Sequence, residues 1–298
     1  MGKPQRLIIA VATLIAVGLW FLSAPDTLSD SEAYAGVGNI EQGQTVFYAG
    51  GCASCHSAPK TTRDAKLLLT GGRAFASPFG TFYAPNISSD SEFGIGNWSN
   101  LDLANAMIKG VSPQGQHYYP AFPYTSYSRV RPSDIVDLRT FLNTLPASTA
   151  KNIKHDLPLP FRFRRALGLW KLIYLNDDAV QETEGLSRGL YLVEGLGHCA
   201  ECHTPRTLLG GMQTTRWMAG APLPKGDGRV PNITPHTDGL AQWSVADITG
   251  YLTSGFTPDF DSVSGLMVDV VENTAHLSGN DRLAIAEYLK ALTPVAKP

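Results

Sequence analysis

The longest apolar stretch of the chain lies near its N-terminus. It runs over Leu7–Leu22 and follows two basic residues, Lys3 and Arg6. Its length falls between that of a secretory h-region, about 7–15 residues, and that of a membrane-spanning helix, about 17–25 residues. The Ala33–Ala35 triplet resembles a cleavage site but lies well beyond the apolar run. We therefore expect residues 1–35 to be an uncleaved membrane anchor with its tether, with a removed signal segment as the alternative. In both cases the basic residues stay in the cytoplasm and the rest of the chain is exported.

Shorter patterns with helical periodicity recur in the same order in two halves of the remaining chain. Helices are predicted around residues 42–47, 98–103 and 134–142 in the first half, and around 187–192, 243–248 and 281–289 in the second. Pro146 and Pro294 end the last helix of each half. The pattern predicts an all-α fold with two tandem domains of one plan, residues 36–148 and 184–298, joined by a linker over 149–183.

The composition is that of a packed globular protein. Of the 298 residues, 43% are hydrophobic and 17% are charged, and the formal net charge is −2. A chain of this composition is not disordered, and it lacks the basic field that attracts nucleic acids. The 29 glycines and 20 prolines indicate a loop-rich fold that wraps around something other than its own side chains.

The four cysteines fall into two identical motifs, each followed directly by a histidine. The motifs are Cys52, Cys55 and His56 in the first half, and Cys199, Cys202 and His203 in the second. Each reads C-x-x-C-H, the attachment motif of c-type haem. Two thiols at this spacing lie on one helical turn, where both can form thioethers with the vinyl groups of one haem. The adjacent histidine can then bind the iron from the proximal side.

Paired cysteines also occur in redox dithiols, structural disulfides and zinc sites. A zinc site made from both pairs would require residues far apart in the chain to meet, and it gives neither histidine a role. Here a histidine follows both pairs, in a chain that is expected to be exported. We therefore predict two covalently attached haems c, one in each of two cytochrome c domains.

A low-spin haem that transfers electrons usually has methionine as its second axial ligand. Met267 is the best-placed methionine of the second half, because it lies in a predicted loop shortly before the last helix. Met212 and Met218 follow His203 more closely and are the alternatives. We predict Met267 as the distal iron ligand of the second haem.

The first half has no methionine at the corresponding position. Counted from the tryptophan that both halves share, Phe122 stands where the second half has Met267, and phenylalanine cannot bind iron. His117 is then the leading candidate for the distal ligand of the first haem. Ligation by Met107 and a five-coordinate iron shielded by Phe122 are the alternatives.

Six further residues are candidates to surround the haems. They are Asn86, Asn232, Trp98, Trp243, Arg73 and Arg206. The asparagines and tryptophans occupy matching positions in the two halves, and haem propionates could accept hydrogen bonds from their N–H groups. For the two arginines, a propionate contact and a surface role are equally open. Pro205 is expected to position the carbonyl group that orients the imidazole of His203.

The predicted linker has a basic part and an apolar part. Arg162, Arg164 and Arg165 follow two prolines, and the apolar run 167–174 comes next. We interpret this run as a strap packed between the two domains. The alternative is a docking surface for a partner or for the membrane.

Several segments in both halves, together with the attachment motifs, resemble those of a known protein family. They are residues 71–75, 83–87, 94–98, 117–124 and 202–206. Over about residues 36–294 the chain resembles the cytochrome c subunits of membrane-bound bacterial dehydrogenases, such as those for alcohol and gluconate. The resemblance implies electron transfer from a quinoprotein or flavoprotein dehydrogenase to a quinone, another cytochrome or an oxidase. Those subunits usually have three haem domains, and they carry methionine at the position of Phe122.

Two functions follow as hypotheses. The first is an electron carrier on the periplasmic side of a bacterial inner membrane, favoured by the membrane segment and by Met267. The second is a dihaem enzyme, peroxidase-like or acting on another small molecule, with the first haem as an open catalytic centre. Phe122 is the residue that favours this alternative.

Overall fold

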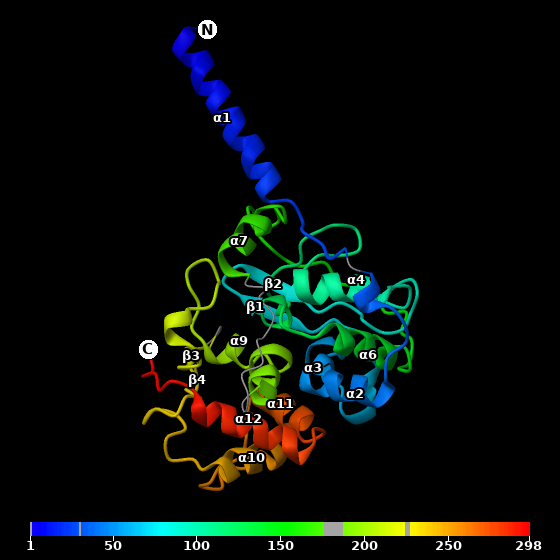
Figure 1. The fold of residues 1–298 in the computed structure, drawn as a ribbon, viewed down its shortest axis with the longest axis vertical. Coiled ribbons are helices and arrows are strands. Elements are labelled where there is room, and N and C mark those ends of the chain that lie inside the picture. The colour runs from blue at the N-terminus through cyan, green and yellow to red at the C-terminus, as the bar shows by residue number, and fades with distance from the viewer. Residues whose placement is uncertain (1, 30, 176–186, 224–226) are drawn as a thin grey trace.

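A computed structural model describes residues 2–29, 31–175, 187–223 and 227–298. A long N-terminal helix, α1 (Lys3–Leu22), projects from a body that contains the rest of the described chain (Figure 1). No residue of α1 is buried. Among the described residues it is the one helix long and apolar enough to cross a membrane, with a mean hydropathy of 2.0. The helix predicted from the apolar run is therefore present, and by itself it fits an anchor or a signal segment.

The helices of the body recur in the predicted order. The first half contains α2 (Ile40–Ala49), α3 (Cys52–His56), α4 (Asn100–Ala104), α5 (Tyr124–Tyr127) and α6 (Pro132–Leu142). The second half contains α8 (Ser187–Leu190), α9 (Ala200–His203), α10 (Val245–Ser254), α11 (Met267–Thr274) and α12 (Gly279–Ala291). Shorter helical turns are 3-10 over Glu32–Tyr34, Arg63–Leu68 and Thr214–Arg216, and π over Asn105–Lys109 and Tyr191–Leu196.

In each half the first and last helices cross closely, and a glycine makes the crossing possible. A Cβ atom at Gly43 of α2 would lie 2.0 Å from the carbonyl oxygen of Asp137 in α6. A Cβ atom at Gly189 of α8 would lie 2.2 Å from the carbonyl oxygen of Ala284 in α12. Because neither glycine carries a side chain, the helices approach closely enough to bury their apolar faces. The core between α2 and α6 contains Val46, Phe47, Ile135, Leu138 and Phe141.

The middle helices begin and end alike in the two halves. Ser99 caps α4 and Ser244 caps α10, each in a capping box with an aspartate three residues later. Gly110 ends the helical segment that follows α4, and Gly255 ends α10, both with a positive φ that only glycine adopts without strain. Equal caps at equal intervals show that the two segments are copies of one local structure.

The expectation of an all-α fold is only partly confirmed, because two small sheets accompany the helices. β1 (Ala74–Ser77) pairs antiparallel with β2 (Gly80–Tyr83), with Ala74 opposite Tyr83. β3 (Ala221–Pro222) pairs antiparallel with β4 (Arg229–Val230). Helical periodicity could not reveal strands of two to four residues. The first hairpin ends one residue before a Pro-Asn-Ile segment and the second ends directly before one, so each hairpin leads into that segment.

The predicted linker packs on the body along its described length. Asp156 pairs with Thr81 of β2, so the start of the linker lies on the first half. The apolar run forms α7 (Ala166–Tyr174), which lies at the end of the body from which α1 departs (Figure 1). Lys171 donates a hydrogen bond to the carbonyl of Gly110, and the Trp170 indole donates to the carbonyl of Leu209. Helix α7 therefore contacts both halves, as expected of a strap.

Candidate functional site

The first C-x-x-C-H motif forms its own short helix. Gly51 has a φ of 58° and turns the chain from α2 into α3. Cys52 and Cys55 lie on one turn of α3 and form no disulfide. Burial raises the pKa of the Cys52 thiol to about 12 and that of Cys55 to about 11. Both thiols therefore stay protonated at neutral pH, unlike a reactive redox dithiol.

The histidine of this motif is oriented by a backbone carbonyl. Nδ1 of His56 lies 2.8 Å from the carbonyl oxygen of Pro85. Burial lowers the pKa of His56, so the ring is neutral. With its proton on Nδ1, donated to the carbonyl, the ring keeps a lone pair on Nε2. This is the state in which an imidazole binds a metal, with its other nitrogen held by a fixed acceptor.

The second motif repeats this geometry with one change before the first cysteine. Cys199 and Cys202 form no disulfide, and burial raises the pKa of Cys199 to about 12. Nδ1 of His203 lies 2.7 Å from the carbonyl oxygen of Pro231, and burial lowers the pKa of His203. His198 stands where the first motif has glycine, although its φ is 39°. A non-glycine residue in this region of backbone space is uncommon.

The two prolines are site residues that the sequence analysis missed. Pro85 and Pro231 occupy matching positions in the Pro-Asn-Ile segments, where the sequence predicted only the neighbouring asparagines as site residues. The carbonyl expected beside Pro205 is in fact supplied by Pro231, which the second hairpin brings under the histidine. The repeat could have identified these prolines as site residues, because both halves carry one at nearly the same distance after the histidine.

The two asparagines hydrogen-bond to the chain that follows the last helix of each half. Nδ2 of Asn86 donates to the carbonyls of Ser148 and Ala150, at 2.7 and 2.9 Å, and Oδ1 accepts from the Ser88 amide. Nδ2 of Asn232 donates to the carbonyl of Val295 at 2.7 Å. Both amides thus join the proline segment to the chain that follows the last helix. These contacts were not predicted, and a propionate contact of either asparagine stays a prediction.

The two arginines brace the attachment motifs. Arg73 bonds the carbonyl of Ser54, which lies between the first pair of cysteines, and it pairs with Asp269 at 2.9 Å. Arg206 bonds both the carbonyl and the carboxylate of Glu201, which lies between the second pair. The partners that the structure shows for these guanidinium groups belong to the protein, and a propionate contact of either arginine stays a prediction.

The two tryptophans lie at matching places beside the middle helices. Trp98 and Trp243 are half-buried, and in the described part of the chain the indole N–H of neither makes a hydrogen bond to protein. Both pack against the core beside the middle helices. Hydrogen bonds from these N–H groups to propionates stay a prediction.

Phe122 and Met267 follow two loops that begin alike. The amide of Tyr118 bonds the carbonyl of Gly110, and the amide of Val263 bonds that of Gly255, both at 2.7 Å. Both loops therefore have the same register as far as Tyr118 and Val263. Beyond this point they differ, because Met267 is the first residue of α11, a helix that was not predicted, whereas Phe122 precedes α5. Phe122 instead packs its ring between two tyrosines, with centroids at 5.9 and 5.7 Å.

His117 lies at the junction with the N-terminal segment. Its Nε2 lies 3.0 Å from the carbonyl oxygen of Ser23, and only 3% of the residue is exposed. Its Nδ1 is buried without a partner among the described residues. When Nε2 donates its proton to the Ser23 carbonyl, Nδ1 keeps the lone pair of the ring. The contact with Ser23 was not predicted, and ligation of iron by His117 stays a prediction.

The two attachment motifs meet at the interface between the halves. Asn273 of α11 donates to the hydroxyl of Ser54 in the first motif at 2.7 Å. In the reverse direction, Thr125 of α5 donates to Glu201 in the second motif at 2.8 Å. Helices α5 and α11 follow the same loop in each half, so each half covers the motif of the other. His198 adds a contact, with Nε2 3.4 Å from the carbonyl of Gly50.

The residues of the motifs match a haem better than a metal ion alone. Among the described residues, no group of three or more His, Cys, Asp or Glu side chains could hold a metal ion. This speaks against the zinc alternative. Each motif has two protonated thiols on one turn and one neutral imidazole. These are the groups that attach haem c covalently and bind its iron on the proximal side.

Comparison with known proteins agrees with this reading. Residues 40–146 match the cytochrome c family. A dihaem c-type cytochrome of Cereibacter sphaeroides is 50% identical over 287 residues, which cover 94% of each chain. The chain belongs to the cytochrome c family. Covalently bound haem c and electron transfer follow for this cytochrome from that membership.

More distant relatives of the cytochrome are subunits of dehydrogenases. The gluconate 2-dehydrogenase cytochrome c subunit of Pantoea cypripedii is 36% identical over 85% of this chain and 59% of its own length. The alcohol dehydrogenase (quinone) cytochrome c subunit of Gluconobacter oxydans is 35% identical over 86% of this chain and 55% of its own length. The cytochrome thus spans a little over half of these subunits. Since its relatives are cytochromes, the alternative of a dihaem enzyme is not favoured.

Ion pairs stabilise the interface between the two halves of the cytochrome beside the first motif. Asp269 of α11 pairs with Lys66 and Arg73 of the first half, both at 2.9 Å. Lys66 also pairs with Glu272. Burial acts to raise the pKa of Asp269, but the hydrogen bonds from Lys66 and Arg73 lower it overall. Helix α11, which begins at Met267, is therefore held against the first motif by its own carboxylates.

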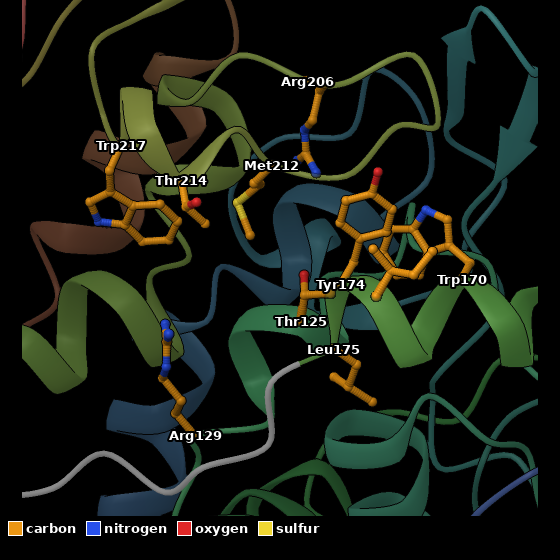
Figure 2. Close-up of a pocket in the computed structure, with 10 residues that line it drawn as sticks. Thr125, Arg129, Trp170, Tyr174, Leu175, Arg206, Met212, Thr214 and Trp217 are labelled. Atoms are coloured by element: carbon orange, nitrogen blue, oxygen red, sulfur yellow. The ribbon is translucent and has the colours of Figure 1, made fainter.

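A cavity of about 210 Å³ lies where α7 meets both halves of the cytochrome (Figure 2). Its lining includes Thr125 and Arg129 of the first half, Trp170 and Tyr174 of α7, and Arg206, Met212 and Trp217 of the second half. Figure 2 shows the sulfur of Met212 directed into the cavity. Because Arg206 also bonds Glu201, this cavity adjoins the second attachment motif.

Proposed function

We propose that this cytochrome carries two haems c, one in each of two tandem cytochrome c domains, residues 36–148 and 184–298. Cys52 and Cys55 would hold the first haem and Cys199 and Cys202 the second. The observation that carries the proposal is that both motifs present two thiols and a histidine fixed by a proline carbonyl. Bound haem supplies the reversible one-electron oxidation and reduction of its iron.

The protein's own groups prepare each site for iron. His56 and His203 are the proximal ligands, and the proline carbonyls fix their orientation and raise their basicity. Met267 is the proposed distal ligand in the second domain. Phe122 blocks the corresponding ligation in the first domain, so the two centres have different reduction potentials. Trp98 and Trp243 are proposed to donate to the propionates.

Contact between the domains makes the two sites one functional unit. Ser54 and Glu201, each in the middle of an attachment motif, both bond the opposite domain. The distance between the two attachment sites is therefore set by a packed interface and not by a flexible linker. A fixed and short separation suits the passage of single electrons through the protein.

We propose that α1 is retained as a membrane anchor, with the body on the periplasmic side. Ser23 is 3% exposed, and its carbonyl contacts His117. Further along, the amide of Leu28 bonds the side chain of Asn105, and Asp26 pairs with Lys109. Cleavage at the Ala33–Ala35 triplet would remove all three contacts. A segment built into the fold in this way is expected to stay attached.

The proposed donor is a quinoprotein or flavoprotein dehydrogenase, and the acceptor is a quinone, another cytochrome or an oxidase. Support comes from the relatives, since cytochrome subunits of gluconate, fructose and quinone-dependent alcohol dehydrogenases are 33–36% identical to this chain.

Haem content and redox titration test the proposal. The purified holoprotein should contain two haem equivalents per chain, and peptide mapping should find thioethers at both cysteine pairs. Replacing either pair by serine, Cys52 with Cys55 or Cys199 with Cys202, should leave one equivalent and remove one of two reduction potentials. Addition of a purified membrane dehydrogenase and its substrate should reduce the wild-type protein. One equivalent in wild type, or a single potential, would contradict the two-centre proposal.

A further inference from the structure

Exposed apolar side chains gather at the end of the body from which α1 departs. We call the following set the apolar rim: Phe161, Phe163, Leu172, Ile173, Leu208 and Leu209. Leu172 and Ile173 of α7 are 65% and 67% exposed, and Leu208 is 98% exposed. Large apolar side chains this exposed and this close together mark a binding surface in most proteins.

The apolar rim is a fixed part of the fold. Lys171 binds α7 to the first domain through the carbonyl of Gly110, and its ammonium lies 4.8 Å from the ring of Tyr124. The Trp170 indole donates to the carbonyl of Leu209 at 2.9 Å, which joins α7 to the 208–209 turn. The rim is therefore one surface made from two segments and presented in a defined direction.

The end of the membrane helix lies directly beside α7. The guanidinium of Arg165 lies 4.3 Å from the ring of Trp20, and it donates to the Trp20 carbonyl at 2.7 Å. A Cβ atom at Gly168 would lie 2.3 Å from the carbonyl oxygen of Ser23, so the backbones touch. Figure 1 shows α7 at the same end of the body as the exit of α1. Helix α7 is therefore held at nearly the same depth in a bilayer as the end of α1.

The composition of this surface fits the interface of a bilayer. Arg162 is exposed between Phe161 and Phe163, and tryptophan at the end of a spanning helix is typical of the headgroup level. Helices with exposed aliphatic side chains beside cationic ones lie in this plane, with their apolar face in the acyl boundary. Arginines there also attract anionic headgroups.

We infer that the apolar rim lies in the headgroup region of the outer leaflet, as a second membrane contact that fixes the orientation of both domains. The inference rests on the proposed retention of α1. A lipid surface explains the rim better than a protein partner does, because the geometry already places the rim at membrane level. The surfaces of both domains that lie far from α7 then face the aqueous phase.

A depth measurement on the full-length holoprotein tests this inference. The native cysteines are consumed by the haems, so an introduced cysteine is the one free thiol for an environment-sensitive fluorophore. We would label Ile173→Cys and Leu208→Cys. The matched control is Phe260→Cys, which is 87% exposed and lies six residues after the end of α10. Figure 1 shows α10 at the end of the body away from α1. The vesicles contain phosphatidylethanolamine and phosphatidylglycerol, with a nitroxide on a fraction of the headgroups.

Labels at positions 173 and 208 should emit at shorter wavelength in vesicles and lose at least half of their intensity to the nitroxide. The label at 260 should keep its aqueous spectrum. Aqueous emission at all three positions would overturn the inference, as would a blue shift without quenching, which would mean cover by protein. Alkaline extraction of the same vesicles tests α1 separately. Protein that resists extraction but has aqueous labels refutes the rim alone, and protein that is released refutes the anchor and the rim together.

Discussion

The ligand positions of the two halves carry different side chains after a shared turn of the backbone. Phe122 and Met267 each stand 12 residues after the glycine that ends a helical segment, and both loops make the same hydrogen bond back to that glycine. Thioether sulfur can bind iron and raises its reduction potential, whereas a phenyl ring cannot bind it. Proximal geometry is alike in both domains. Any difference between the two potentials is therefore expected to arise mainly on the distal side.

Phe122→Met should raise the reduction potential of the first haem. A rise on the order of 100 mV is expected, a fraction of the roughly 0.8 V range that axial ligands set. The matched change Met267→Phe should lower the potential of the second haem by a similar amount. Redox titration followed by absorption spectroscopy measures both. If Phe122→Met leaves both potentials unchanged, the loop of the first domain does not face the iron.

Among the elements, α11 connects the ligand position of one domain to the attachment motif of the other. The helix begins at Met267. Asp269 in its first turn pairs with Lys66 and Arg73 of the first half, and Asn273 one turn later bonds Ser54. Its counterpart α5 is shorter and carries no acidic side chain. Helices α5 and α11 therefore contact the opposite half in the same arrangement, but only α11 does so with charged side chains.

Asp269→Asn should reduce the free energy of unfolding by about 1–2 kcal/mol, between the values of exposed and buried ion pairs. The folded protein holds the pKa of Asp269 below its usual 3.8. The carboxylate therefore contributes stability that is fully present above about pH 4 and is lost as the pH falls further. Denaturant unfolding at pH 7 and pH 3 measures this difference between wild type and variant, which should shrink at the lower pH.

The exposed Asp259→Asn is the control for this measurement, and it should change stability by less than about 0.5 kcal/mol. Equal effects of the two substitutions at pH 7 would show that the ion pairs of Asp269 do not hold the interface.

In the whole molecule, the N-terminal segment, α7 and both domains share one junction. The carbonyl of Ser23 contacts His117, the side chain of Ser23 accepts from Arg165, and Gly168 packs against its backbone. His117 therefore joins the anchor to the first domain. The repeat alone suggested a ligand at this position, because a histidine near the distal loop is a reasonable candidate when methionine is absent.

His117→Ala should leave the absorption spectrum of the oxidised protein unchanged and lower its stability by about 1–3 kcal/mol, because the buried carbonyl of Ser23 loses its partner. Absorption spectra and thermal unfolding of the holoprotein provide the two readouts. His236→Ala is the control, since this histidine bonds only its own turn. A change of the first haem to high spin in His117→Ala would instead identify His117 as its ligand.

The features of this protein that depend on local spacing can be recognised in its sequence. The two C-x-x-C-H motifs, the repeated order of helices, the apolar N-terminal helix and the exchange of Phe122 for Met267 are all visible along the chain, because a helical turn or a loop register spans few residues. The short hairpins escaped detection, since pairs of two to four residues leave no periodicity.

The packing of the folded chain determined which groups meet across long separations. It placed the carbonyls of Pro85 and Pro231 beside the two histidines, whereas a carbonyl positioned by Pro205 was expected for His203. It also directed Arg73 to Asp269, nearly two hundred positions along the chain. Hydrogen-bond partners of this kind follow from how two domains pack, and packing depends on the shape of whole surfaces, which no local pattern of residues encodes.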